Sequence, residues 1–244
     1  MTARDDDAPP TSGGPGRPRG RTAAGDATRK KLYATALKSF RARGYDETTL
    51  RDIAEAADVS PSLLYKYFPS KRAIVLELYE DLSGRYADEA THMKAGSWRD
   101  RFMFALETSL RVLGPHREAL SALVPVLVGR GEESVFASTT SPARARVQGV
   151  FVAAVTEASD APSGEMAEAM GTLLYVMHLG IILWWLLDRS PGQRATGELV
   201  KALHRGKPLA ALGVHLPYAR GFVTSAAAIC RDGLFGEPAP GAAP

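Results

Sequence analysis

Apolar residues recur at helical spacing along most of the chain, and no stretch shows the strict alternation that predicts a strand. The first predicted helix can start at Asp26 or Thr28, its residues Leu32, Ala36 and Phe40 repeat every four positions, and Gly44 ends it. The same period continues far into the C-terminal half. We therefore expect an all-α protein.

Caps, glycines and prolines divide the remaining chain into further helices. A long helix is expected to follow the cap Ser70 and to end near Lys94. At about 1.5 Å per residue it would span roughly 35 Å. The later pattern predicts breaks at Gly114-Pro115, Gly129–Ser141 and Asp160–Gly164, and helices over Gly164–Asp188, Gly192–Arg205 and Ala219–Cys230.

The helix predicted over Gly164–Asp188 is apolar on every side. Such a helix has to be covered all round, so we expect its own core on one side and a second subunit on the other. Its apolar run Leu173–Leu187 is shorter than the roughly 20 residues that a bilayer requires. The predicted homodimer interface joins this helix to the small-residue stripe of the last one, at Leu174, Trp185, Ala219, Phe222, Val223 and Ala226.

Between these regions, the stretch Thr48–Lys71 predicts two short helices separated by a turn. Either Thr48 or Thr49 can cap the first helix, and Ser60 followed by Pro61 forms a cap before a proline at the first position of the second. An ordinary helical hairpin in a core would show the same caps. The exposed residues favour a DNA-binding helix-turn-helix, because the free side of the second helix is small, aromatic and basic: Pro61, Ser62, Tyr65 and Lys66.

From Thr28 through Tyr79, about the first third of the chain, the order of residues resembles the DNA-binding domain of TetR-type (tetracycline-repressor-like) transcriptional regulators. The residues that carry the resemblance are the helix Leu32–Arg43, the Gly44-Tyr45 turn, and the segments TTLRDIAEAADVS and LLYKYFPSK. The resemblance implies an N-terminal helix-turn-helix domain, joined by a long helix to a C-terminal helical domain for ligand binding and dimerisation.

The resemblance also implies roles for single residues. It places Thr49, Tyr65, Tyr67 and Lys71 on DNA phosphates, which position the protein without carrying sequence information. It places Arg51, Pro61, Ser62 and Lys66 nearest the base edges, where Arg51 and Lys66 have the chemistry that suits guanine. The residues at Pro61, Ser62 and Lys66 depart from those common in the family, which leaves the base preference open.

Residues 1–26 lack a periodic apolar pattern and are expected to be disordered. Arg17, Arg19 and Arg21, spaced by glycine and proline, resemble a short AT-hook-like arm suited to the minor groove of A/T-rich DNA. A generic solubilising tail is an equally good interpretation. The predicted organisation is an arm (1–26), a DNA-binding domain (27–72), a ligand-binding and dimerisation domain (73–235) and a disordered tail (236–244).

Charge and cysteine content agree with this interpretation. The net charge is only +3, but a sequence pI of about 9.0 is consistent with binding a polyanion through one region. A single cysteine, Cys230, excludes an internal disulfide and suits a reducing compartment. The N-terminal segment carries Asp5, Asp6 and Asp7 and no apolar core, so we do not expect a signal peptide. The expected location is the cytoplasm.

No sequence motif predicts catalysis. The five histidines lack metal-ligand spacing, and the chain has no glycine-rich phosphate loop, nucleophile elbow or zinc-protease motif. We therefore expect no metal, no cofactor and no enzymatic activity. An enzyme on a helical scaffold would need a buried cluster of titratable groups with strongly shifted pKa values.

The remaining question is the small-molecule pocket that the resemblance implies. Aromatic and methionine residues of the C-terminal region are typical of a core when taken singly, but as a group they suggest a pocket lined by Phe102, Tyr175, Met177, His178 and Trp184. Trp184 and Trp185 lie about 100° apart on a helix, so only one can face a given cavity. The predicted function is a repressor released from an inverted-repeat operator by a hydrophobic molecule. The alternative is a regulator controlled by a protein partner, which an absence of any cavity would favour.

Overall fold

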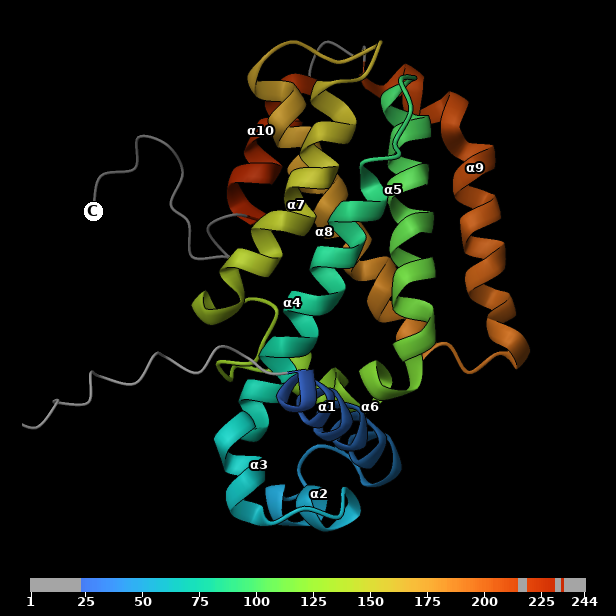
Figure 1. Ribbon diagram of the computed structural model, residues 1–244. Coiled ribbons are helices and arrows are strands. Elements are labelled where there is room, and N and C mark those ends of the chain that lie inside the picture. The colour runs from blue at the N-terminus through green and yellow to red at the C-terminus, as the bar shows by residue number, and fades with distance from the viewer. Residues whose placement is uncertain (1–22, 215–218, 231–233, 235–244) are drawn as a thin grey trace, which may run out of the picture.

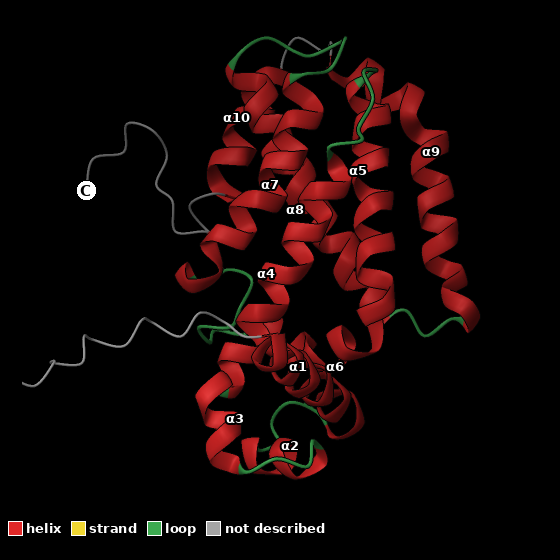
Figure 2. Ribbon diagram, viewed as in Figure 1, coloured by secondary structure: helices red, strands yellow, loops and turns green. Residues whose placement is uncertain are grey.

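The computed structural model describes residues 23–214, 219–230 and 234, and these form helices and loops without a strand (Figures 1 and 2). The all-α prediction is confirmed. The helices are α1 (Ala23–Arg43), α2 (Leu50–Ala56), α3 (Pro61–Tyr67), α4 (Lys71–Ala90), α5 (Trp98–Leu113), α6 (Arg117–Leu127), α7 (Ser141–Thr156), α8 (Glu165–Leu187), α9 (Arg194–Val214) and α10 (Ala219–Cys230).

Most predicted boundaries lie close to those of the structure, and α9 is the main exception. It continues to Val214, well past the predicted end at Arg205, and Gly206 lies inside it. A single glycine weakens a helix by only about 1 kcal/mol, so it does not have to end one. At the other end of the chain, α1 begins at Ala23, before the predicted first residues.

The three N-terminal helices form a compact unit at one end of the molecule, and α4 runs from it into a helical bundle (Figure 1). In the bundle, α7 packs along α8, and α10 packs against α8 as well. Helix α9 lies on the outside beside α5. Helix α6 lies under the bundle and contacts α1.

The core of the N-terminal unit is built from fully buried side chains such as Phe40, Ile53 and Leu64. This core does not end at the predicted domain boundary after residue 72. Residues of α6 and of the end of α8, including Leu123 and Trp185, belong to the same apolar cluster. The N-terminal unit therefore packs on the bundle through a shared core. A displacement of α6 or α8 would change the packing of the N-terminal unit directly.

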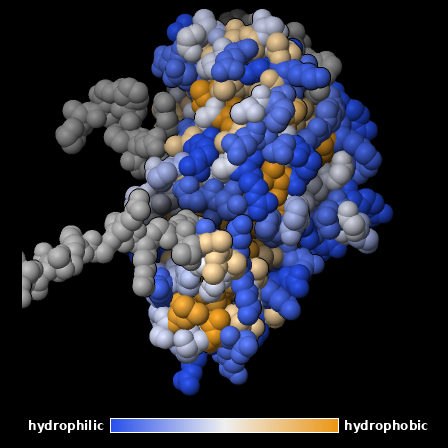
Figure 3. Space-filling model, viewed as in Figure 1, coloured by the Kyte–Doolittle hydropathy of each residue, from blue (hydrophilic) through white to orange (hydrophobic). Residues whose placement is uncertain are grey.

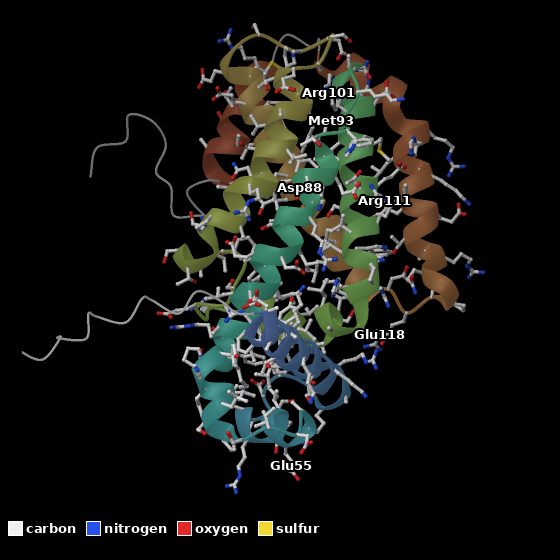
Figure 4. The ribbon with its side chains drawn as sticks, in the orientation of Figure 1. Glu55, Asp88, Met93, Arg101, Arg111 and Glu118 are labelled. Atoms are coloured by element: carbon white, nitrogen blue, oxygen red, sulfur yellow. The ribbon has the colours of Figure 1, made fainter. Side chains whose placement is uncertain are left out.

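The upper part of the bundle is held by a second apolar cluster and by a buried arginine. The guanidinium of Arg101 on α5 donates to the carbonyls of Ala153 and Ala154 near the end of α7, at 3.1 and 3.2 Å, and to that of Lys94 at 3.0 Å. It also pairs with the Glu157 carboxylate at 2.8 Å. Figure 4 shows Arg101 at this upper end of α5. The arginine thus fixes α5 to the last turn of α7.

Helix α8 has the length and mean hydropathy of a membrane span, and half of its most apolar window is buried inside the protein. The central helix of a globular bundle has the same composition, because it is covered on several sides. The apolar character of α8 is therefore weak support for a membrane span.

Helices α7 and α8 approach each other closely at Gly171. A Cβ at this position would lie 2.6 Å from Val152 Cα and 3.1 Å from Phe151 O, both backbone atoms. We expect Gly171→Ala to destabilise the protein by about 1–3 kcal/mol in chemical denaturation, because the helices have to move apart. Gly149→Ala in α7 is the matched control, since its Cβ would meet nothing within 4 Å. The control should be neutral or slightly stabilising, and equal effects would contradict the close approach.

Candidate nucleic-acid interface and internal cavity

Helix α2 begins with a complete capping box. Thr49 Oγ1 accepts a hydrogen bond from Asp52 N at 3.1 Å, and Asp52 Oδ2 accepts one from Thr49 N at 2.9 Å. The hydrogen bond from the Thr49 backbone to the carboxylate, and next the Thr49 side chain, lower the pKa of Asp52. Of the two possible caps, Thr49 is the one used, because Thr48 is buried and donates to Gly44 O at 2.7 Å.

Helix α3 packs one side inward and leaves the other uncovered. Ser60 caps it by accepting from Leu63 N at 3.2 Å, and Leu64 is fully buried against α1, α2 and α4. The space-filling view shows a hydrophobic patch near α3 on an otherwise mostly hydrophilic face (Figure 3). The predicted DNA-contacting side chains of α3 are exposed at Pro61, Ser62, Tyr65 and Lys66.

Helix α2 presents two charged residues on its free side. Arg51 is exposed, as the prediction of a base contact requires. Glu55, one turn later, projects from the outer end of the unit (Figure 4). An acid there would repel DNA phosphates, so the charge of Arg51 is the one available to DNA on this helix.

The structure gives Lys71 a role that the sequence did not predict. Its ammonium donates to the carbonyls of Tyr45 and Asp46 at 2.7 and 3.3 Å, and it lies 4.4 Å from the centre of the Tyr45 ring. The lysine at the start of α4 therefore ties down the turn between α1 and α2. The resemblance placed Lys71 on a DNA phosphate, and the structure shows that its ammonium also has two carbonyl partners within the protein.

Three of the four predicted phosphate contacts lie together. Thr49, Tyr65 and Lys71 line one open groove on the surface of the N-terminal unit, while Tyr67 is half-buried outside it. The sequence analysis missed Tyr45, Arg72 and Glu133, which also line the groove. Arg17, Arg19 and Arg21 lie outside the described residues, so their minor-groove role stays a prediction.

The bundle contains a cavity of about 150 Å³ next to the shared core. Its wall takes residues from α4, α5, α6, α7 and α8 and from the loop before α7, and it is almost wholly apolar. The wall includes the guanidinium of Arg144, which donates to the carbonyls of Val135 and Ala137. Among its other polar residues, Tyr86, Ser109 and His178 lie together. Ser109 Oγ lies 2.8 Å from His178 Nε2, and the Tyr86 and His178 rings are nearly parallel at 6.4 Å.

Two of the five predicted ligand contacts line this cavity, namely Tyr175 and His178. Phe102 belongs to the upper apolar cluster, where its ring lies 6.0 Å from that of Phe151. Met177 and Trp184 are on the outside of α8, 39% and 51% exposed. The structure thus does not place these three at the cavity, because the side of α8 that faces inward is the one carrying Tyr175, His178 and Ile182.

Two residues of the predicted dimer interface are covered within the protomer itself, and the interface as a whole stays a prediction. Leu174 and Trp185 are buried within the protomer, at 8% and 6% exposure, and the Arg117 guanidinium lies over the Trp185 ring. Phe222, which was also predicted at the interface, is 74% exposed, and Trp184, which was not, is 51% exposed. Neither tryptophan lines the cavity. The other predicted interface residues lie on α10: Val223 and Ala226 are half-buried, and Ala219 begins the helix.

The loop between α6 and α7 touches both the cavity and the N-terminal unit. Val135 lines the cavity, as does Tyr79, whose hydroxyl donates to Glu133 O at 2.9 Å. On the other side, the Tyr45 hydroxyl donates to the Glu133 carboxylate at 3.0 Å. Burial and this bond raise the pKa of Tyr45, so the hydroxyl stays a donor at neutral pH. Glu132 pairs with Arg72 at the start of α4.

A capped helix pair with an uncovered basic face, carried by a helical bundle, defines a DNA-binding regulator of the helix-turn-helix class. Residues 32–78 match the family of bacterial regulatory proteins described as the tetR family. The matched segment is the part of the chain that carries the helix-turn-helix, and the curated proteins that resemble this chain are named as transcriptional regulators. The resemblance predicted from the sequence is confirmed.

Individual relatives show how far the similarity extends. The HTH-type transcriptional regulator EthR of Mycolicibacterium smegmatis is 26% identical over 72% of this chain and 83% of its own length. TcmR of Streptomyces glaucescens is 37% identical, but over only 31% of this chain and 34% of its own length. The match to TcmR therefore covers about a third of that protein.

Solved structures share the fold. A tetR-family transcriptional regulator from Streptomyces coelicolor has a TM-score of 0.55 at 20% identity, over 83% of this chain and 88% of that one. The TetR transcriptional regulator from Nitrosomonas europaea has a TM-score of 0.54 at 19% identity, over 73% and 96%. At this level of identity the likeness concerns the fold alone.

Proposed function

We propose that the protein is a cytoplasmic repressor that binds an inverted-repeat operator as a homodimer and leaves it when a small apolar molecule fills the cavity. The observation that carries the DNA-binding part is the uncovered side of α3, with Ser62, Tyr65 and Lys66 exposed opposite the buried Leu64. A helix held in this way fits the major groove of B-DNA.

In this arrangement, the groove lined by Thr49, Tyr65 and Lys71 takes a backbone phosphate. The Thr49 hydroxyl accepts a bond from Asp52 N, so its own hydrogen can point to a phosphate oxygen. Arg51 is exposed on α2 and Lys66 on α3. Both side chains reach base edges, where their hydrogen-bond donors suit guanine.

Support for the homodimer comes from the apolar surface of α8 and α10, which pack side by side. Met177, Trp184 and Leu187 are exposed at helical spacing on α8, and Phe222 is exposed on α10. A second copy would cover these residues around a two-fold axis. The two α3 helices would then enter successive major grooves about 34–36 Å apart, which requires an inverted repeat.

The switch is supported by the position of the cavity. Its wall includes Tyr79 and Val135, and through Glu133 and Glu132 the same loop contacts Tyr45 and Arg72 of the DNA-binding unit. A ligand that binds one arrangement of this loop better than the other shifts the population of DNA-binding geometries. The cavity favours a small molecule over a protein partner as the signal.

Two experiments test the proposal together. Selection from random DNA duplexes should recover an inverted repeat, and a thermal-shift screen of small apolar compounds should find molecules that also weaken binding to that repeat. If the wild-type protein bound a half-site as tightly as the full repeat, the proposed binding as a homodimer would be wrong. If compounds bound tightly without changing operator affinity, the proposed release from DNA by a ligand would be wrong.

The Tyr45→Phe variant tests the route of the signal. It removes only the hydroxyl that donates to Glu133. We expect operator affinity without ligand to change little, while the loss of affinity caused by ligand becomes smaller, by up to about 1–3 kcal/mol of coupling. Operator titrations with and without ligand measure both quantities. Arg41→Ala is the control, since its exposed ion pair with Glu118 also joins α1 to α6 but bypasses the loop. A control that lost as much coupling would rule out this route.

A further inference from the structure

The cavity wall contains two buried polar atoms that have no hydrogen-bond partner in the described part of the protein: Nδ1 of His178 and the hydroxyl of Tyr86. Both residues line the cavity, and their rings lie nearly parallel, one on α8 and one on α4. Buried polar groups are nearly always hydrogen-bonded, so a pair of exceptions in one apolar cavity requires an explanation.

The chemistry of His178 Nδ1 follows from Ser109. Among the described residues, Ser109 Oγ has one hydrogen-bond partner, His178 Nε2 at 2.8 Å. We assign the serine hydroxyl as the donor and Nε2 as the acceptor, because the reverse arrangement would leave the Ser109 O–H proton without a partner as well as His178 Nδ1. Complete burial lowers the pKa of His178 to about 3, so the ring is neutral and carries a single proton. That proton is on Nδ1.

The wall thus holds an unpartnered N–H and, on Tyr86, an unpartnered O–H. Burial raises the pKa of Tyr86, so its hydroxyl also remains protonated. The two groups are neutral donors, and the molecule that complements them carries an acceptor. A carbonyl oxygen, with two lone pairs, is suited to either donor or to both.

The volume limits the size of this molecule. A cavity of about 150 Å³ is several times the roughly 30 Å³ that one water occupies in the liquid. An apolar cavity of that size accepts a single benzene ring. A lone water on the two donors would leave most of the apolar wall without contacts.

Resting on the proposed function, because it concerns the ligand of the same cavity, we infer that the effector is a neutral molecule with one ring or an equivalent short apolar body and a carbonyl-type oxygen. The oxygen accepts a hydrogen bond from His178 Nδ1 or Tyr86, and the apolar body fills the space between α4 and α8.

Three probes of the same shape separate the alternatives. Acetophenone has a carbonyl oxygen, α-methylstyrene replaces it with a methylene group, and benzoate is a similar anion. We expect acetophenone to bind at least about tenfold more tightly than either, measured by NMR titration of the full-length protein. Equal or stronger binding of α-methylstyrene or benzoate, or no binding of acetophenone, would overturn the inference.

Two variants locate the acceptor. Tyr86→Phe and His178→Phe each remove one donor and keep a ring, and at least one should reduce the preference for acetophenone over α-methylstyrene to about twofold or less. If both variants keep the full preference, the oxygen binds elsewhere and the inference is wrong. Independently of any variant, ¹⁵N spectra of the imidazole should show the proton of His178 on Nδ1, and a proton on Nε2 would contradict the argument.

Operator titration with the same probes separates this inference from the proposed function. A probe that releases DNA without any preference for the carbonyl would overturn the inference and leave the switch standing. If acetophenone bound with the expected preference but did not change DNA affinity, the inference about the ligand would be supported, and the proposed release from DNA by a ligand would be wrong.

Discussion

Replacing Phe222 with Arg is expected to convert the protein into a monomer that no longer holds its operator. Phe222 is the most exposed large apolar residue described, at 74%, and it lies on α10 beside α8. In the proposed dimer, an arginine there would bury an unpaired charge. A monomer engages one half-site, so operator affinity should fall by roughly 100-fold or more. Size-exclusion chromatography with light scattering and operator titration measure the two effects.

The control for this variant is Val128→Arg. Val128 is 48% exposed at the C-terminal end of α6, and it is not part of the proposed interface on α8 and α10, so an arginine there should leave mass and affinity unchanged. Circular dichroism should show the same helical content for both variants, because Phe222 buries little surface within the protomer. A Phe222→Arg protein that stays dimeric would place the interface elsewhere.

Arg51→Ala should have the second large effect, on operator recognition. Arg51 is exposed on α2, and its side chain is proposed to contact a base in each half-site. Loss of such a contact costs about 1–3 kcal/mol, and two half-sites bring the total to roughly 2–6 kcal/mol. Binding to unrelated DNA should change much less. Titrations with the selected operator and with a scrambled duplex provide the comparison.

Lys71→Ala serves as the contrasting variant, because a phosphate contact is independent of sequence. It should weaken binding to both duplexes alike and make the slope of log affinity against log salt shallower by about 1.8 for two lost contacts. It should also lower the melting temperature, since Lys71 bonds to the carbonyls of Tyr45 and Asp46. An unchanged salt slope would show that Lys71 has only its structural role. If Arg51→Ala lost equal affinity for both duplexes, Arg51 would contact a phosphate and not a base.

Local sequence signals were sufficient for the helices and for the N-terminal unit. The caps Thr49, Ser60 and Ser70 and the proline at the start of α3 act over three or four residues, so their effects are visible in the sequence. The long apolar α8 was equally clear, within one residue at each end. Helix α9 was harder, because the weak cost of Gly206 competes with contacts made elsewhere in the fold.

What the sequence determined by itself is therefore the set of helices, the helix-turn-helix and the family resemblance of the N-terminal unit. The tertiary structure decided which side of α8 faces inward, because all its sides are apolar and periodicity cannot distinguish them. It also decided the contact of Lys71 with Tyr45, which is 26 positions away in the chain, and the pairing of His178 with Ser109, which is 69 positions away. Such pairs depend on how whole helices pack, and helix packing is set by side-chain shapes from several segments at once.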